Sequence, residues 1–173
     1  MVRTWLYSDP HFGQQNILKF DTYKGDKLRS LWDDIDKHDN DLITWYNELV
    51  DDNDRVYILG DIAMNRKGLD KSLPFLKGRK VLIKGNHDQD KLSYYSKYFD
   101  DIRGVVSKQG FVLSHVPLHP DSLERWGLNI HGHLHSNVVR LSNGEVDNRY
   151  RCVCVEQTNW RPILLEKVID NNP

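Results

Sequence analysis

The segment Leu128-Asn129-Ile130-His131-Gly132-His133-Leu134-His135 places three histidines within five residues, directly after a short apolar run. Short runs of this kind, bounded by Gly, Pro, Asn or Asp, are typical of β-strands. Alternate side chains of an extended segment point to the same face, and Gly132 permits a tight backbone path where the strand ends. The segment therefore predicts a strand whose end delivers several imidazoles to one place.

Four other predicted strands end in the same kind of polar segment. Asp9-Pro10-His11 follows 2–8, Gly60-Asp61 follows 55–59, Gly85-Asn86-His87-Asp88 closely follows 80–83, and Ser114-His115 ends the run 110–114. In open α/β sheets the functional crevice lies beyond the carboxyl ends of the strands. We therefore expect five strand ends to direct Asp, His and Asn side chains into one crevice.

The other patterns predict helices in the first half of the chain and further strands in the last third. Helices are expected over 31–49, where apolar residues recur at helical spacing, and over 68–76 and 90–98. Strands are expected over 137–141, 149–156 and 163–168, with Ser142-Asn143-Gly144-Glu145 as a hairpin turn. This order predicts a single domain over residues 1–173, with a parallel-type α/β core that ends in antiparallel strands.

The composition excludes several classes of protein. Lys and Arg total 24 against 25 Asp and Glu, so no basic surplus points to duplex DNA or an anionic membrane as the main partner. Cys152 and Cys154 cannot form a disulfide framework, and no apolar run reaches the roughly 18 residues of a membrane span. We therefore expect a cytoplasmic protein with a small-molecule substrate, no membrane attachment and no extended nucleic-acid surface.

The donor types in the expected crevice indicate metal binding. Imidazole, carboxylate and amide oxygen suit divalent Mn, Fe, Zn or Ni, and the absence of cysteine from the set argues against a structural zinc site. Seven or so donors exceed the needs of one tetrahedral ion. They suit two ions that share a bridging carboxylate, roughly 3.5–4 Å apart.

The order of these blocks resembles the calcineurin-like metallophosphoesterase superfamily, which is marked by D-x-H, G-D, G-N-H-[DE], a lone His and G-H-x-H. All five blocks are present between Asp9 and His135. The start of the chain and its closing Asn159-Trp160-Arg161-Pro162 are similar to a small branch of predicted phosphoesterases. The resemblance implies an α/β fold, a two-sheet β-sandwich flanked by helices in four α/β/β/α layers, with a dimetal site at one edge.

The resemblance also implies the roles of individual residues. The first metal would be held by Asp9, His11, Asp61 and His135, and the second by Asp61, Asn86, His115 and His133. His87 would donate a proton or stabilise the transition state, and Asp88 would orient its imidazole. The implied activity is that of a dimetal-dependent phosphoesterase, with Mn as the expected metal, in which a metal-bound hydroxide attacks small phosphodiesters or nucleotides. The alternative is a catalytically silent binding or scaffold module of the same fold.

Departures from the pattern narrow the expected substrate. Protein Ser/Thr phosphatases follow their Gly-Asp with Asp-Arg-Gly and use Gly-Asn-His-Glu, whereas this chain has the apolar stretch 62–64 and ends the second block in Asp88. A phosphodiesterase is therefore expected rather than a monoesterase or a protein phosphatase. The sequence leaves open whether four further polar residues take part in the site: Gln14, Arg66, His119 and Arg161. A structural role is favoured for the two arginines and for the histidine. His38 is expected to be structural, and His131 to hydrogen-bond behind the ligands.

Overall fold

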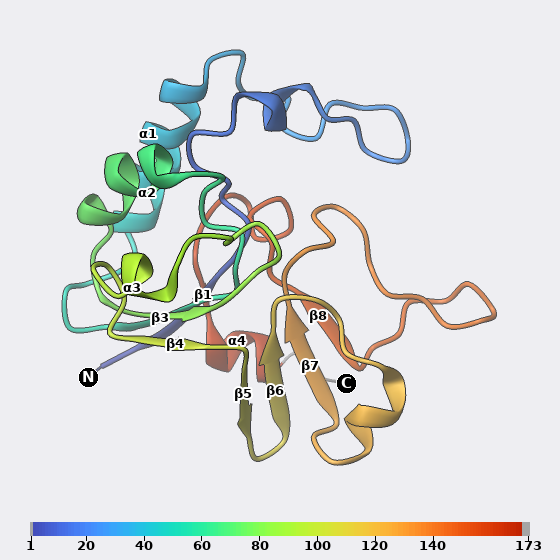
Figure 1. Ribbon diagram of the computed structural model, residues 1–173. Helices are drawn as coiled ribbons and strands as arrows, with labels where there is room; N and C mark the ends of the chain where they lie inside the picture. The colour runs from blue at the N-terminus through green and yellow to red at the C-terminus, as the bar shows by residue number, and fades with distance from the viewer. Residues whose placement is uncertain (1, 171–173) are drawn as a thin grey trace.

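The computed structural model describes residues 2–170 and packs two β-sheets face to face (Figure 1). The larger sheet has the order β4-β3-β2-β1-β9, with all neighbours parallel except β1 and β9. Its strands are β1 (Thr4–Tyr7), β2 (Arg55–Ile58), β3 (Arg79–Ile83), β4 (Asp101–Arg103) and β9 (Ile163–Leu164). The smaller sheet has the order β5-β6-β7-β8 and consists of β5 (Val105–Lys108), β6 (Phe111–Ser114), β7 (Leu128–His131) and β8 (Tyr150–Cys152).

Alternating side chains of the larger sheet build two separate cores. Trp5 and Tyr7 of β1 join the core beneath the helices, whereas Leu6 joins the core between the sheets. The same alternation separates Val56 from Tyr57 on β2. A central strand buried on both faces is what a parallel sheet covered on both sides requires, so the sandwich fold predicted from the sequence is confirmed.

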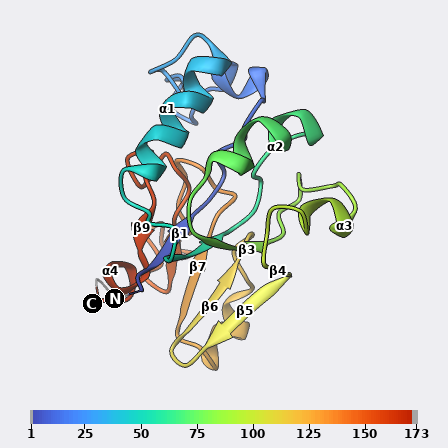
Figure 2. The same cartoon turned by 90° about the vertical axis from the view of Figure 1, so that its left-hand side faces the viewer.

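Helices cover the face of the larger sheet that points away from the smaller one (Figures 1 and 2). The helices on this face are α1 (Ile35–Asn47), α2 (Arg66–Ser72) and α3 (Leu92–Tyr95), whereas α4 (Leu165–Asp170) packs between the sheets. The 3₁₀ turns are η1 (Gln15–Lys19), η2 (Leu73–Phe75) and η3 (Pro120–Glu124). The outer face of the smaller sheet is covered more thinly, where Leu123 of η3 packs on Val112 and Tyr150. No helix among residues 2–170 is both long and apolar enough to cross a bilayer.

Several predicted elements differ in extent from those observed. The long helix starts at Ile35 rather than Leu31, because the Asp34 side chain caps it by accepting from the Lys37 amide at 2.7 Å. The predicted strand 163–168 was wrong beyond Leu164, because Leu165, Val168 and Ile169 recur at helical spacing and pack between the sheets as α4.

The last third of the chain also pairs differently from the prediction. The expected strand 137–141 is a loop with one antiparallel bridge, Arg140 to Val146, around the predicted turn, where Gly144 has φ +87°. The expected antiparallel ending was wrong for the smaller sheet, because β6, β7 and β8 run parallel. This parallel arrangement brings the carboxyl ends of β6 and β7 to the same edge, which is where their histidines lie.

Candidate functional site

Two groups of donor atoms lie at the carboxyl ends of the strands. One consists of Asp9, His11 and His135, and the other of Asp61, His115 and His133; within each group the ligand atoms lie within 4.8 Å of one another. The two groups adjoin, because Asp61 Oδ2 lies 3.4 Å from His115 Nε2 and 3.8 Å from His11 Nε2. Six of the residues predicted to bind metal are therefore gathered into two adjacent sets.

Asn86, the seventh, lies beside the second group, with its Oδ1 2.8 Å from His115 Nε2. His87 lies beside the first group, where its ring centroid is 5.8 Å from that of His11 in an edge-on arrangement. The His87 backbone amide donates to Asp61 Oδ1 at 2.8 Å. The Gly85-Asn86-His87-Asp88 segment thus reaches both groups from the end of β3.

Left-handed backbone conformation is concentrated at the donor residues. Five of them have positive φ: Asp9 at 58°, His11 at 53°, Asp61 at 50°, His133 at 68° and His135 at 51°. Such angles are uncommon for residues other than glycine and occur in sharp turns. The chain therefore turns sharply at the donor residues that follow β1, β2 and β7.

Two glycines allow these turns to approach one another. A Cβ added at Gly132 would collide with Ser8 Oγ and with Asp9 Oδ2, and one added at Gly85 would collide with Asp61 Oδ1. Glycine is thus needed at both positions for a close backbone approach to a carboxylate. This explains the glycine in two of the sequence blocks.

The two oxygens of Asp9 have different environments. Oδ2 accepts from the Ser8 hydroxyl, from the His133 amide at 2.9 Å and from the Cys154 thiol at 3.1 Å. Oδ1 is buried and has no hydrogen-bond partner among the described residues, and the same holds for both ring nitrogens of His11. Burial raises the pKa of Asp9, but the neighbouring histidines, His11 first, hold it well below its usual range. One oxygen is thus held by the protein, whereas the other is free to bind a cation.

Asp88 has a role different from the predicted one. Its carboxylate accepts from the backbone amides of Asp61 at 2.9 Å, Ile62 at 3.1 Å and Gly85 at 2.8 Å. The expectation that it orients the His87 imidazole was therefore wrong, because both of its oxygens are used to hold the turns that carry Asp61 and Asn86. Burial raises the pKa of Asp88, and the nearby Asp61 charge adds to this effect.

A hydrogen bond to the backbone fixes the tautomer of His115. Its Nδ1 lies 2.7 Å from the Leu59 carbonyl oxygen, to which it donates, so Nε2 is left to face Asp61 and Asn86. Burial lowers the pKa of His115, but Asp61 and Asp9 outweigh it and raise the value to about 9. The carboxylates thus make this part of the site strongly attractive to positive charge.

A buried charge network supports His135. The His135 Nδ1 lies 2.9 Å from Glu156 Oε1, and the same carboxylate pairs with Arg29 Nη2 at 2.7 Å. Arg29 is fully buried and also donates to the backbone carbonyls of Asp9 and Pro10, each at 2.6 Å. A carboxylate bonded to Nδ1 leaves Nε2 of His135 as the metal-facing nitrogen, as in carboxylate–histidine–metal arrangements.

The same network continues into helix α1. Arg29 Nη1 lies 2.8 Å from His38 Nε2, and His38 Nδ1 lies 2.8 Å from Asp39 Oδ1. Asp39 Oδ2 then accepts from the Gly13 amide at 2.8 Å, in the segment that follows His11. The structural role predicted for His38 is confirmed, since it is buried as a link between Arg29 and Asp39.

Sequence reasoning missed Arg29 and Glu156. Glu156 follows the apolar run 152–155, so the strand-end rule that selected the ligands could have selected it as well. Arg29 carries no such signal, because it lies between helices in no recognisable pattern and meets Glu156 across 127 positions of sequence. Sequence reasoning also gave Cys154 no place in the site, although its thiol contacts Asp9.

The residues left open by the sequence have contacts outside the two donor groups. Arg66 pairs with Asp90 at 2.7 Å, and Arg161 pairs with Glu48 at 3.1 Å. His119 is exposed and caps η3. His131 Nδ1 hydrogen-bonds the Gly132 carbonyl at 2.7 Å, behind His133 and His135. Gln14 is half-buried, and its backbone amide donates to the His11 carbonyl at 3.1 Å.

The donor set fits divalent cations. The buried, unpartnered atoms Asp9 Oδ1, His11 Nδ1 and His11 Nε2 lie inside it, and buried polar atoms of this kind are normally satisfied. Imidazole and carboxylate donors in such an arrangement are those that Mn, Fe, Zn and Ni accept. The residues present can therefore hold metal.

Comparison with known proteins agrees with this chemistry. The family model described as calcineurin-like phosphoesterase matches residues 2–163. The chain belongs to this family. The match includes every donor residue of both groups, and divalent metals are the cofactors that the family uses.

Relatives of this phosphoesterase extend over most of its length. An uncharacterized protein of Methanocaldococcus jannaschii is 31% identical over 177 residues, covering 98% of this chain and 90% of the relative. The gene 66 protein of Mycobacterium phage D29 is 28% identical over 81% of this chain and 82% of its own. A crystal structure of a protein of unknown function from Aquifex aeolicus superposes with a TM-score of 0.68, at 26% identity, covering 97% of this chain and 98% of the other.

Proposed function

We propose that this phosphoesterase holds two divalent ions and hydrolyses small phosphodiesters. The observation that supports the proposal best is the position of Asp61, whose Oδ2 adjoins His11 of one donor group and His115 of the other. A carboxylate between two donor sets is what a bridging ligand requires. The chemistry that two such ions supply is Lewis acidity toward the phosphate oxygens and a lowered pKa for coordinated water.

The protein's own residues would divide the remaining work. His87 is half-buried beside His11 and can donate a proton to the leaving oxygen or stabilise developing charge. Asn86 can bind a metal ion with its amide oxygen or donate to a substrate oxygen with its amide nitrogen. Asp88 and the Arg29–Glu156 pair would keep the donor turns rigid, because they bond to the backbone or to ligand nitrogens rather than to substrate.

Metal content tests the proposal directly. After chelation and reloading with manganese, we expect about two ions per chain by elemental analysis, because the donor atoms form two sets. A His119→Ala variant, which removes an exposed histidine outside both sets, is expected to keep the same stoichiometry. A single ion per chain, or none, would contradict the dimetal centre.

Replacing His87 separates chemistry from metal binding. His87→Ala is expected to retain both ions and to lower kcat roughly 10²–10⁴-fold, the usual contribution of a positioned general acid. Its backbone amide, which donates to Asp61, is unchanged by the substitution. Turnover equal to that of the unmodified enzyme would show that this imidazole takes no part in the reaction.

The pairing of three arginines favours a diester over a monoester substrate. Monoester dianions gain from cationic groups, commonly bidentate arginines. Arg66 and Arg161 are paired with Asp90 and Glu48, and the donors of buried Arg29 are directed to Asp9, Pro10, His38 and Glu156. We therefore expect the phosphate contacts to come from the metals, Asn86 and His87, which suffice for a monoanion.

The preference is measured as kcat/KM for bis-p-nitrophenyl phosphate against p-nitrophenyl phosphate in the manganese enzyme. We expect the diester to be hydrolysed at least as efficiently as the monoester. The diester is chemically the slower reaction, so parity already supports the proposal. A monoester preference of about 100-fold, some 2.7 kcal/mol of transition-state binding, would overturn it.

A further inference from the structure

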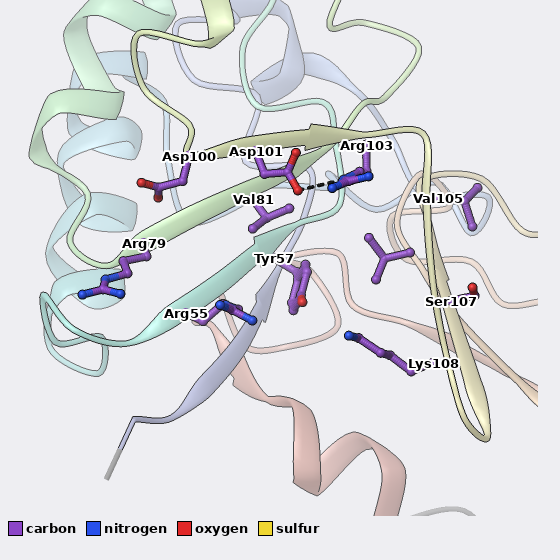
Figure 3. A pocket seen from close by; sticks show the side chains of 11 residues that line it. Arg55, Tyr57, Arg79, Val81, Asp100, Asp101, Arg103, Val105, Ser107 and Lys108 are labelled. Atoms are coloured by element: carbon purple, nitrogen blue, oxygen red, sulfur yellow. Dashed lines mark hydrogen bonds and ion pairs between the residues drawn. The ribbon is translucent and has the colours of Figure 1, made fainter.

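A cavity lies away from the donor residues, at the amino ends of β2 and β3 (Figure 3). It has a volume of about 620 Å³ and is bordered on one side by β2, β3 and β4 and on the other by the edge strand β5. A second cavity of about 300 Å³ adjoins it, and the two share Arg55, Tyr57, Val106 and Lys108. Together they form a groove at the open edge of the sandwich, with these four residues at its centre.

The groove carries uncompensated positive charge. Arg55 and Arg79 are paired residues on neighbouring parallel strands, and Lys108 approaches from β5. Within residues 2–170, none of these three side chains has a carboxylate at ion-pair distance. Like charges on adjacent strands repel each other. An anion placed among them would relieve this repulsion.

Most acidic side chains near the groove form ion pairs with Arg3 or Arg103. Asp101 pairs with Arg103 at 2.7 Å, and both Asp51 and Asp54 pair with Arg3. Asp100 is the remaining acid of the lining, and it is exposed beside Arg79 (Figure 3). The lining of this cavity carries four cations, Arg55, Arg79, Arg103 and Lys108, and two acids, Asp100 and Asp101, so its formal net charge of +2 matches a dianion.

The centre of the groove offers donors next to an apolar wall. In Figure 3, Tyr57 is drawn between Arg55 and Lys108, and all three line both cavities. Guanidinium, ammonium and phenol present N–H and O–H donors, which suits a phosphoryl group. The adjoining cavity is lined mainly by apolar side chains, including Phe111, Leu113 and Leu165. A ligand held here can therefore place its charge at Arg55 and Lys108 and an apolar group against this wall.

We propose that this groove binds an organic phosphate, with its dianionic phosphoryl group between Arg55 and Lys108 and its apolar group on Phe111, Leu113 and Leu165. The site is separate from the donor groups, since none of its lining residues belongs to them. The ligand expected here is a dianion that binds without metal, whereas the proposed substrate of the phosphoesterase reaction is a monoanion that binds to the metals.

The test uses phenylphosphonate, which cannot be hydrolysed at its P–C bond, titrated calorimetrically into chelator-treated protein. We expect one molecule to bind per chain, and inorganic phosphate and benzyl alcohol each to bind at least about tenfold more weakly, because each supplies half of the contacts. Arg55→Ala and Lys108→Ala are each expected to weaken phenylphosphonate at least about tenfold. Arg125→Ala, which removes an exposed arginine outside the groove, is the matched control.

Two outcomes would overturn the proposal. One is binding that is unchanged in both Arg55→Ala and Lys108→Ala, because the cations would then have no part in it. The other is binding that is lost in Asp61→Asn but retained in the groove variants, which would place the probe at the donor residues. Because the protein is metal-free throughout, failure here leaves the proposed phosphodiesterase activity untouched, and failure of that activity leaves this result intact.

Discussion

Asp61→Asn is expected to lose both ions and, with them, more activity than the roughly 10²–10⁴-fold predicted for His87→Ala. Asparagine tolerates the left-handed backbone of this turn, where φ is 50°, and keeps an oxygen for the His87 amide. The substitution therefore removes the charge that lies between His11 and His115 while preserving the fold. Metal affinity is expected to fall more than about 100-fold, since even residues that only support ligands contribute 10–100-fold.

The measurement is metal titration followed by elemental analysis, with circular dichroism to establish that the variant is folded. Asp90→Asn is the matched control, because Asp90 pairs with Arg66 outside both donor groups. The control is expected to bind metal like the unmodified chain. Two tightly bound ions in Asp61→Asn would mean that this carboxylate does not bridge the donor groups.

Arg29→Ala is expected to reduce the free energy of unfolding by about 3–5 kcal/mol, the range for removing one partner of a buried ion pair. The substitution leaves the Glu156 carboxylate buried without its cation, and it removes the donors to the Asp9 and Pro10 carbonyls. The pKa of Glu156, which burial alone would raise, is held below its usual value by Arg29 and His135. Urea unfolding of the metal-free protein measures the change.

A partner variant separates charge from packing in this network. The double variant Arg29→Met, Glu156→Gln is expected to recover part of the lost stability, because no buried charge is left unpaired. Arg161→Ala, at the more exposed pair with Glu48, is expected to cost no more than about 1 kcal/mol. A loss for Arg29→Ala as small as that of Arg161→Ala would mean that Arg29 does not stabilise the site.

The sequence predicted the strands that carry donor residues better than the strands that carry none. The predicted runs 2–8, 55–59 and 80–83 are each followed within three residues by Asp, Asn or His, and both signals are local. The adjacent strands β4 and β5 were missed, because Asp101, Arg103, Ser107 and Lys108 give them no apolar run. Strand direction in the smaller sheet was also missed, since pairing is decided by contacts between segments that are distant in sequence.

For the candidate site, the residues that face the crevice could be predicted and those behind it could not. A donor residue follows its own strand, so its position is visible in the local pattern. The contact between Arg29 and Glu156 exists only in the folded chain. Asp88 illustrates the opposite error. Its place next to His87 in the sequence suggested a contact with that imidazole, but its carboxylate accepts from the Asp61 and Gly85 amides instead. Asp39 likewise belongs to an acidic helix face in sequence but is buried against His38 and Gly13.

The left-handed turns at the donor residues have a consequence for how this chain balances stability against activity. A left-handed conformation costs roughly 1–2 kcal/mol per residue, somewhat less for Asp. Over five such residues the total is comparable to the free energy of unfolding of a native domain, which is about 5–15 kcal/mol. The buried network and the two sheets therefore help to offset this energy in the folded chain. Relaxing these turns would yield a more stable protein without the donor geometry that a metal centre needs.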